Sequence, residues 1–187
     1  NGQKPGALLR TRERDTSHER LSQGAVILDG SENASVQYAQ CCRPVPGDSS
    51  VGYLGRGEGL VVHTSGCAVA ARLKHRDSER FIAVDWADEP VRQFETGLVV
   101  TVTNRKGVLA RVAADLAQSE VDITKVDMGE EDQQDTTDLR FVISVRDTAH
   151  LDAALRNLKR TPSVLRCLSY TSPSPRDATL SRTPSSA

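Results

Sequence analysis

The pattern of apolar positions is most regular in the second half of the chain. Residues 94–103 and 136–145 alternate apolar and polar side chains, which is typical of strands with one buried face. Apolar residues from Val108 to Ala117 recur every three or four positions, and the same spacing returns from Leu151 to Leu158. This spacing predicts two helices, each with one apolar face.

Two shorter strand patterns, at 121–129 and 164–170, complete the second half. The predicted order is therefore strand, helix, strand, strand, helix, strand. Right-handed crossovers turn this order into a four-stranded antiparallel sheet with both helices on one face. We expect this ferredoxin-like βαββαβ arrangement, and with it an α+β fold class.

The first half has a less regular pattern of short elements. The clearest signal is a hairpin, in which 51–54 and 60–63 flank the glycine-rich loop GRGEG. This loop leads into a strand and not into a helix, so it lacks the context of a phosphate-binding loop. Thr64 or Ser65 is expected to cap the helix that follows, GCAVAARLK. Further strands are predicted at GAVILDG, 35–40 and 80–86.

Composition divides the chain into four parts. Residues 1–24 are polar and charged without periodicity, and we predict a linker or a disordered segment. Residues 25–90 form a small mixed module that contains three of the four cysteines. The segment ADEPVRQ separates it from the ferredoxin-like domain at 91–170. The last part, 171–187, is rich in Ser, Pro and Thr and is predicted to be a disordered tail.

Charge and hydropathy argue against several classes of function. The formal net charge is −1, which is not that of a protein that coats nucleic acid, although a local basic patch remains compatible with it. No apolar run is long enough to span a membrane, and the N-terminus lacks the apolar core of a secretory signal. These features indicate reduced thiols and a cytoplasmic setting. Because Met128 is the only methionine, we interpret the chain as a fragment or a processed product.

Three cysteines and one histidine form the candidate metal centre: Cys41, Cys42, His63 and Cys67. Three thiolates and an imidazole suit a closed, structural zinc site, which would stabilise a module with little core. Adjacent cysteines can both bind one ion only if the backbone turns there, and the prolines that follow favour a turn. Three alternatives remain open: packed thiols, a Cys67 nucleophile activated by His63, and redox chemistry of the vicinal pair. Cys167 is expected in the core.

A second candidate site is the turn NRKG at 104–107, between a predicted strand and a predicted helix. Free N–H groups at a helix N-terminus attract carboxylates, and Gly107 would let a ligand or another backbone come close. A plain turn that favours glycine explains the same residues. A base-stacking RNA platform is poorly supported, because 136–145 offers a single phenylalanine and the segment LVVTVT none.

The string AQCCRPVPGDSSVGYLGRGEGLVVHTSGC, followed by the strand–NRKGVL–helix pattern, resembles two consecutive domains of the RelA/SpoT family. These are a conserved-cysteine (zinc-finger-like, RIS) module and an ACT domain, and the resemblance covers about 25–170. Members of this family make and degrade the alarmone (p)ppGpp in the stringent response, with their catalytic domains N-terminal to these modules. The resemblance therefore implies a regulatory part without catalytic residues. The parent protein would be a GTP pyrophosphokinase, a (p)ppGpp hydrolase or both.

The resemblance also implies roles for individual residues. The four residues of the candidate metal centre match the zinc ligands proposed in the family. The ACT turn of the family usually reads Asp-Arg-Pro-Gly, whereas this chain has Asn104 and Lys106 in the first and third places. A lost carboxylate and a gained cation favour an anionic ligand, such as an amino-acid carboxylate. The implied ligand-binding residues are Asn104, Arg105, Lys106, Gly107, Val108 and Leu109.

The partners implied by the resemblance are the ribosome, through rRNA near the A-site tRNA, and the catalytic half of the same protein. Basic residues around the hairpin and the following helix would contact rRNA phosphates, although a solvated basic face explains them equally: Arg56, Arg72, Lys74 and Arg76. The alternative function is an amino-acid-sensing ACT module that acts through ligand binding and homodimerisation.

Overall fold

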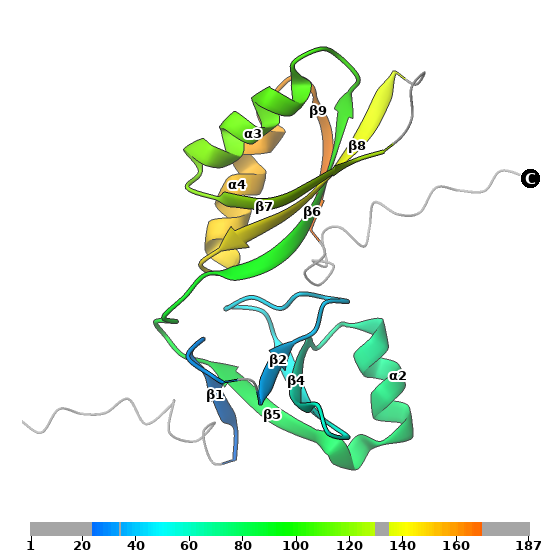
Figure 1. Ribbon diagram of the computed structural model, residues 1–187, viewed down its shortest axis with the longest axis vertical. Coiled ribbons are helices and arrows are strands. Elements are labelled where there is room, and N and C mark those ends of the chain that lie inside the picture. The colour runs from blue at the N-terminus through cyan, green and yellow to red at the C-terminus, as the bar shows by residue number, and fades with distance from the viewer. Residues whose placement is uncertain (1–23, 34, 130–134, 170–187) are drawn as a thin grey trace, which may run out of the picture.

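The computed structural model describes residues 24–33, 35–129 and 135–169. They form two lobes that follow one another along the longest axis (Figure 1). The predictions for most of the N-terminal linker and for the C-terminal tail lie outside the described residues. Within the described part, no helix is long and apolar enough to cross a membrane.

The first lobe, here called the cysteine lobe, is a five-stranded sheet with one helix. Its strand order is β1-β5-β3-β4-β2, with β3 and β4 as the predicted antiparallel hairpin and β2 parallel to β4. Its elements are β1 (Val26–Leu28), β2 (Val36–Tyr38), β3 (Ser50–Gly55), β4 (Gly59–Thr64), α2 (Ala68–Arg76), the 3₁₀ turn η1 (Ser78–Arg80) and β5 (Phe81–Trp86).

The second lobe, here called the ferredoxin-like lobe, has the predicted βαββαβ order. Its four strands are antiparallel in the order β7-β8-β6-β9, and both helices cover one face of the sheet (Figure 1). The α+β fold class expected from the sequence is confirmed. Its elements are β6 (Phe94–Thr103), α3 (Val108–Gln118), β7 (Asp122–Met128), β8 (Thr136–Val145), α4 (Thr148–Lys159) and β9 (Val164–Ser169).

The core of the ferredoxin-like lobe follows the alternation of its two central strands. Leu98, Val100 and Val102 of β6 are fully buried, as are the alternate apolar residues of β8. The apolar faces of α3 and α4 close over these side chains and bury residues such as Val112 and Leu158. Burial of this apolar surface is the main stabilising contribution in the lobe. The expected core position of Cys167 is also confirmed.

The cysteine lobe has a much smaller core around its thiols. Cys42 and Cys67 pack with Ala39 and Ala70 in a cluster of four buried residues. These four side chains bury little apolar surface, and the larger residues packed against them, such as Phe81, are only partly buried, so the cluster contributes less to stability than the core of the other lobe. A metal ion that links its thiols would therefore add stability that the packing does not supply.

The start of α2 differs from the prediction that Thr64 or Ser65 caps it. The helix begins at Ala68, the N-cap is Cys67, and no side chain accepts a capping hydrogen bond. Thr64 lies before the helix, and its backbone N–H donates to the Cys42 sulfur at 3.3 Å. The chain turns once more before the helix begins, because the Cys67 N–H donates to the Thr64 carbonyl at 3.0 Å.

The loop after the paired cysteines joins the two lobes. Val45 is fully buried and belongs to the core cluster of the ferredoxin-like lobe, although it follows β2 of the other lobe. Next to it, the Thr148 N–H at the start of α4 donates to the Pro46 carbonyl at 2.8 Å. Tyr38 stacks on Trp86 at 5.7 Å and meets Phe94 edge-on at 5.2 Å, which adds an aromatic contact at the junction.

Replacement of Val45 by alanine is expected to lower the free energy of unfolding by about 2 kcal/mol, because it removes two buried methyl groups from a core that cannot fully close around the gap. Equilibrium denaturation followed by circular dichroism measures the effect. Val91→Ala is the matched control, since that side chain is 68% exposed and its loss should be nearly neutral. Equal stability of the two variants would show that the loop does not hold the lobes together.

Candidate metal centre

Three neighbouring elements bring the four candidate ligands together. Cys41 and Cys42 follow β2, which pairs with β4 so that Tyr38 lies opposite Val62. His63 is the next residue on β4, and Cys67 is the N-cap of α2 directly after that strand. The sequence predicted that the four candidate ligands converge if the strand before Cys41 pairs beside the hairpin. The structure has this strand pairing, and the four side chains converge.

A tight turn directs both adjacent cysteines toward one centre. The Arg43 N–H donates to the Ala39 carbonyl at 2.8 Å, which closes a turn around the two cysteines. Arg43 has a φ of 43°, a left-handed conformation that costs a residue with a side chain about 1–2 kcal/mol. The sequence could only state that such a turn was necessary, and the structure shows which bond closes it.

Most distances within the cluster are close to those of a tetrahedral zinc site. The Cys41 sulfur lies 4.0 Å from that of Cys42, 3.6 Å from that of Cys67 and 3.5 Å from His63 Nδ1. Cys42 lies 3.8 Å from the same nitrogen, and all four ligand atoms are within 4.8 Å of one another. Zinc–sulfur bonds of about 2.3 Å give a tetrahedron with edges of about 3.8 Å. The four residues are therefore compatible with a zinc ion, with their longest separation above the tetrahedral edge.

The surroundings of the cluster shift the pKa values of its members in different directions. Burial raises the pKa of Cys42 to about 12 and also raises that of Cys41. Burial lowers the pKa of His63, so its imidazole is neutral near pH 7 and can act as a ligand. For Cys67, burial raises the pKa, but hydrogen bonds from the Ala70 and Val69 N–H groups and from the neighbouring thiols of Cys41 and Cys42 together outweigh it, so the pKa falls. A metal ion would bind the thiolates and so replace these protons.

The geometry bears on the alternatives left open by the sequence. A Cys67 nucleophile would need His63 as its neighbouring base. His63 Nδ1 instead contacts the thiols of Cys41 and Cys42. Cys67 is also only 8% exposed. A closed set of four protein ligands leaves no open coordination position for substrate, so a bound zinc would have a structural role.

The ACT-type turn lies at the far end of the ferredoxin-like lobe. Residues 104–107 are exposed, and the Asn104 N–H donates to the Asp135 carbonyl at 2.8 Å. Gly107 is the N-cap of α3 with a φ of 82°, which favours glycine. Of the six residues implied as ligand-binding, Val108 is instead buried in the core and Leu109 is half-buried against it.

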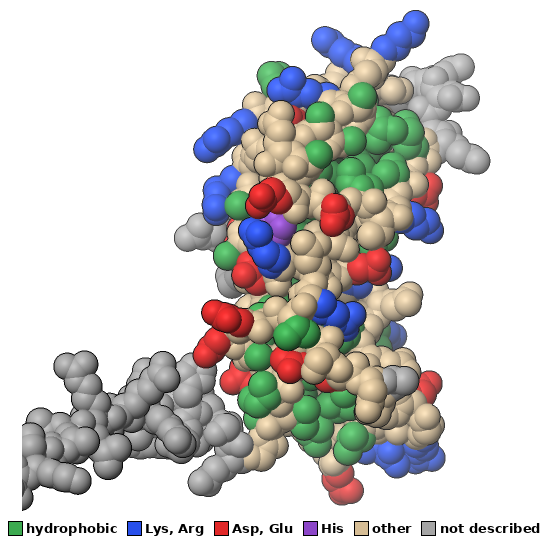
Figure 2. All heavy atoms as spheres, turned by 60° about the vertical axis from the view of Figure 1, so that its left-hand side comes forward, with side chains coloured by type: hydrophobic (Ala, Val, Ile, Leu, Met, Phe, Trp, Pro, Cys, Tyr) green, Lys and Arg blue, Asp and Glu red, His purple; other side chains and the backbone are tan. Residues whose placement is uncertain are grey.

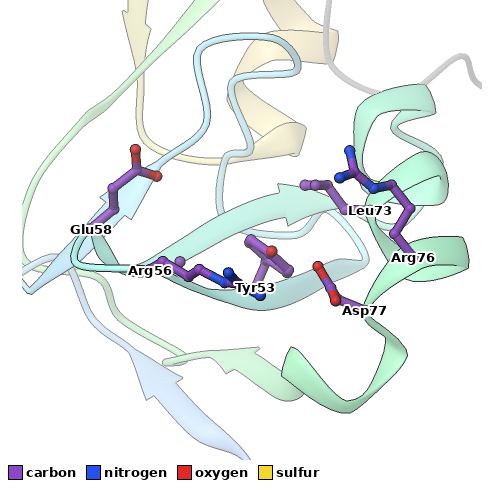
Figure 3. A pocket seen from close by; sticks show the side chains of 7 residues that line it. Tyr53, Arg56, Glu58, Leu73, Arg76 and Asp77 are labelled. Atoms are coloured by element: carbon purple, nitrogen blue, oxygen red, sulfur yellow. The ribbon is translucent and has the colours of Figure 1, made fainter.

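The basic residues predicted to contact rRNA separate into two sets. Arg56 at the tip of the hairpin and Arg76 at the end of α2 line one groove with Tyr53, with a volume of about 690 Å³ (Figure 3). Arg72 and Lys74 are exposed on α2 but do not line this groove. Tyr53 was not predicted as part of a site, because its strand position alone does not show that it shares a groove with Arg56 and Arg76.

Comparison with known proteins gives the chain two consecutive family matches. Residues 26–87 match the RelA/SpoT RIS domain, and residues 90–168 match the ACT domain. The crystal structure of the ACT domain from the GTP pyrophosphokinase of Chlorobium tepidum covers 41% of this chain and 97% of its own, with 14% identity and a TM-score of 0.37.

Curated relatives match across both domains. The bifunctional (p)ppGpp synthase/hydrolase SpoT of Escherichia coli K12 is 30% identical over 146 residues, which are 78% of this chain and 20% of that protein. The GTP pyrophosphokinase of Photobacterium angustum is 26% identical over 149 residues, 80% of this chain and 20% of its own length. The chain thus spans about a fifth of the length of these relatives.

The cysteine lobe and the ferredoxin-like lobe are therefore a RIS domain followed by an ACT domain. The chain belongs to the RelA/SpoT family, whose members act in (p)ppGpp metabolism, and it matches the region of those proteins that carries these two domains.

The purified, reduced chain is expected to contain about one zinc ion, because its four ligands already lie close to tetrahedral spacing. The Cys41→Ser/Cys42→Ser double variant should lose the metal and the cooperative melting of the cysteine lobe. Elemental analysis and differential scanning calorimetry measure the two effects. Cys167→Ser is the control, because this thiol is buried in the other lobe and should leave the zinc content unchanged. A fully folded chain without metal would contradict the structural role.

Proposed function

We propose that this chain is the regulatory part of a (p)ppGpp synthetase/hydrolase of the bifunctional type, which docks to the ribosome at rRNA near the A-site tRNA and controls the catalytic half of the same protein. The observation that carries the proposal is the groove of Tyr53, Arg56 and Arg76 on the cysteine lobe. The family membership supports the same function, since the relatives act on (p)ppGpp by name.

The groove combines the two chemical features with which proteins hold RNA. Figure 3 shows Arg56 reaching from the hairpin toward Tyr53, with Arg76 on the neighbouring helix. Arginine side chains bind phosphates, and an aromatic ring can stack on a base. Lys74 and His75 also lie in the last turn of α2, next to Arg76 in the sequence but outside the lining of the groove. Glu58 and Asp77 also line the groove and would restrict the positions at which phosphates can approach.

The metal centre would hold this groove in shape. The hairpin that carries Arg56 includes β4, which presents His63, while α2, which carries Arg76, begins directly after Cys67. An ion bound to both residues would fix the helix against the hairpin, and so would fix the spacing of the two arginines. The buried contact of Val45 then ties the cysteine lobe to the ACT domain, so that both domains can respond to docking together.

Replacement of both Arg56 and Arg76 by glutamine is expected to weaken ribosome binding. It should also reduce the slope of log affinity against log salt concentration by about one to two, because two phosphate contacts are lost. Ribosome pelleting at several salt concentrations measures both effects. Arg156→Gln is the control, since this exposed arginine lies on α4 away from the groove. Equal binding by the double variant and the control would remove the groove from the docking surface.

A specific observation also favours the second candidate function, an amino-acid-sensing ACT domain that dimerises. Strand β7 is an edge of the sheet, and Val126 and Met128 on it are 40% and 48% exposed. Figure 2 shows hydrophobic side chains gathered on the surface of this lobe. An exposed apolar edge strand can pair with the same edge of a second copy. The turn at Gly107 would then lie beside the partner and could bind a ligand between them.

Replacement of Gly107 by leucine is expected to abolish both dimerisation and the rise in melting temperature caused by a branched-chain amino acid. Gly57→Leu is a matched control: both glycines have a positive φ, of 82° and 85°, and a Cβ at either would meet nothing within 4 Å. The backbone strain is therefore similar, while only Gly107 lies in the ACT turn. Sedimentation equilibrium and thermal melting test the prediction, and equal behaviour of the two variants would refute it.

A further inference from the structure

A cavity of about 270 Å³ lies where the two lobes meet; it borders the metal centre at Cys41 and is separate from the groove and the ACT turn. One wall is the turn after β2, with Gln40, Cys41 and Arg43. The other wall belongs to the central strands and the edge strand β7 of the ferredoxin-like lobe, where Lys125 and Arg140 line the cavity. Each lobe therefore supplies only part of this site.

The cavity lies on the face of the ACT sheet that the helices leave uncovered. On β8, Leu139, Phe141 and Ile143 are buried beneath the helices, so Arg140 points to the opposite side. Lys125 and Asp127 on β7 pair with Val142 and Arg140 in the sheet register. Their side chains therefore share this open face with Arg140 and are directed toward the cysteine lobe.

The side chains that line the cavity carry more positive than negative charge. Among the described residues that line it, Arg43, Lys125 and Arg140 are cationic, and Asp127 is the one carboxylate. Arg43 has a second neighbour, Glu95, whose carboxylate is 3.5 Å away but 55% exposed. Such an exposed pair is weak and can exchange for a better acceptor. The cations thus outnumber the acids in a partly open cavity, which favours a compact anion of more than one charge.

The position of Arg43 is fixed by the backbone on both sides. Its N–H closes the turn onto Ala39, and the next residues, Pro44 and Val45, are buried. Arg43 also keeps a left-handed backbone that glycine or asparagine would adopt with less strain. A glycine at this position would form the same turn with less backbone strain. The turn instead carries an arginine, whose cationic side chain lines the cavity. A backbone outlier of this kind supports a functional role for the side chain.

We propose that this cavity binds the phosphate or diphosphate group of a small phosphorylated ligand, which joins the RIS and ACT domains. Guanidinium groups bind phosphate oxygens with paired hydrogen bonds, and a lysine adds a point charge. Because Arg43 belongs to one lobe and Lys125 and Arg140 to the other, an anion between them neutralises charge on both and holds the lobes together. The site goes beyond the proposed ribosome docking and uses none of the residues of the groove.

The test is isothermal titration calorimetry of the full chain with inorganic pyrophosphate at low salt. Arg140→Gln and Lys125→Gln are each expected to weaken binding about tenfold, because each removes a charge-assisted contact. Asp127→Asn is expected to tighten binding about threefold, because it removes the carboxylate that repels the anion. All three positions are exposed on strands, so these changes should leave the fold intact. Arg156→Gln on α4 is the control and should bind as the unchanged chain does.

A second arm identifies the source of the phosphate group. Guanosine 5′-diphosphate that competes with pyrophosphate and binds more tightly would identify a nucleotide ligand, whereas equal affinities would identify the bare diphosphate group, and both support the site. The proposal is overturned if the unchanged chain does not bind pyrophosphate at millimolar concentration. It is also overturned if Asp127→Asn weakens binding, if Arg156→Gln weakens binding as much as Arg140→Gln, or if only a short RNA hairpin binds. Ribosome docking could persist in each of these cases, so the two proposals fail separately.

Discussion

The turn that the Arg43 N–H closes onto the Ala39 carbonyl is the constraint on which the rest of the arrangement depends. It directs Cys41 and Cys42 toward His63 on the neighbouring strand, which a continued strand could not do. The same turn sends the following prolines toward the second lobe, where Val45 fills part of the core. One backbone hydrogen bond therefore contributes both to the metal centre and to the contact between the domains.

Because one turn contributes to both the metal centre and the contact between the domains, the RIS domain also influences how the ACT domain is held. The buried cluster around the thiols of the RIS domain is small and consists of cysteine and alanine side chains, with a few partly buried apolar residues packed against it. An ion bound by the four ligands would fix the turn, the hairpin and the start of α2 relative to one another. The groove with Arg56 and Arg76 and the cavity at Arg43 are both formed by elements that leave this centre. A change at the metal would therefore reach both proposed binding surfaces and the ACT domain.

Much of the fold could be predicted, since its signal is local. The alternation in 94–103 and 136–145 and the helical spacing from Val108 correspond to β6, β8 and α3, because strand and helix periods differ clearly. The errors concern short-range detail, where several hydrogen-bond partners compete. Neither Thr64 nor Ser65 caps α2, because the thiol-rich turn places Cys67 at that position. The spacing of the candidate ligands identified the cluster, but no spacing predicts a closed tetrahedron.

The sequence by itself determined the βαββαβ domain, the four candidate ligands and the resemblance to the RelA/SpoT family, because periodicity and residue identity are local properties. Only the tertiary structure decided which cations face one another. It brings Arg56 and Arg76 into one groove and leaves Arg72 and Lys74 out of it. It also combines Arg43 with Arg140, nearly a hundred positions later in the chain, in one cavity. Such pairings depend on strand register and on the packing of one domain against the other, which no local pattern encodes.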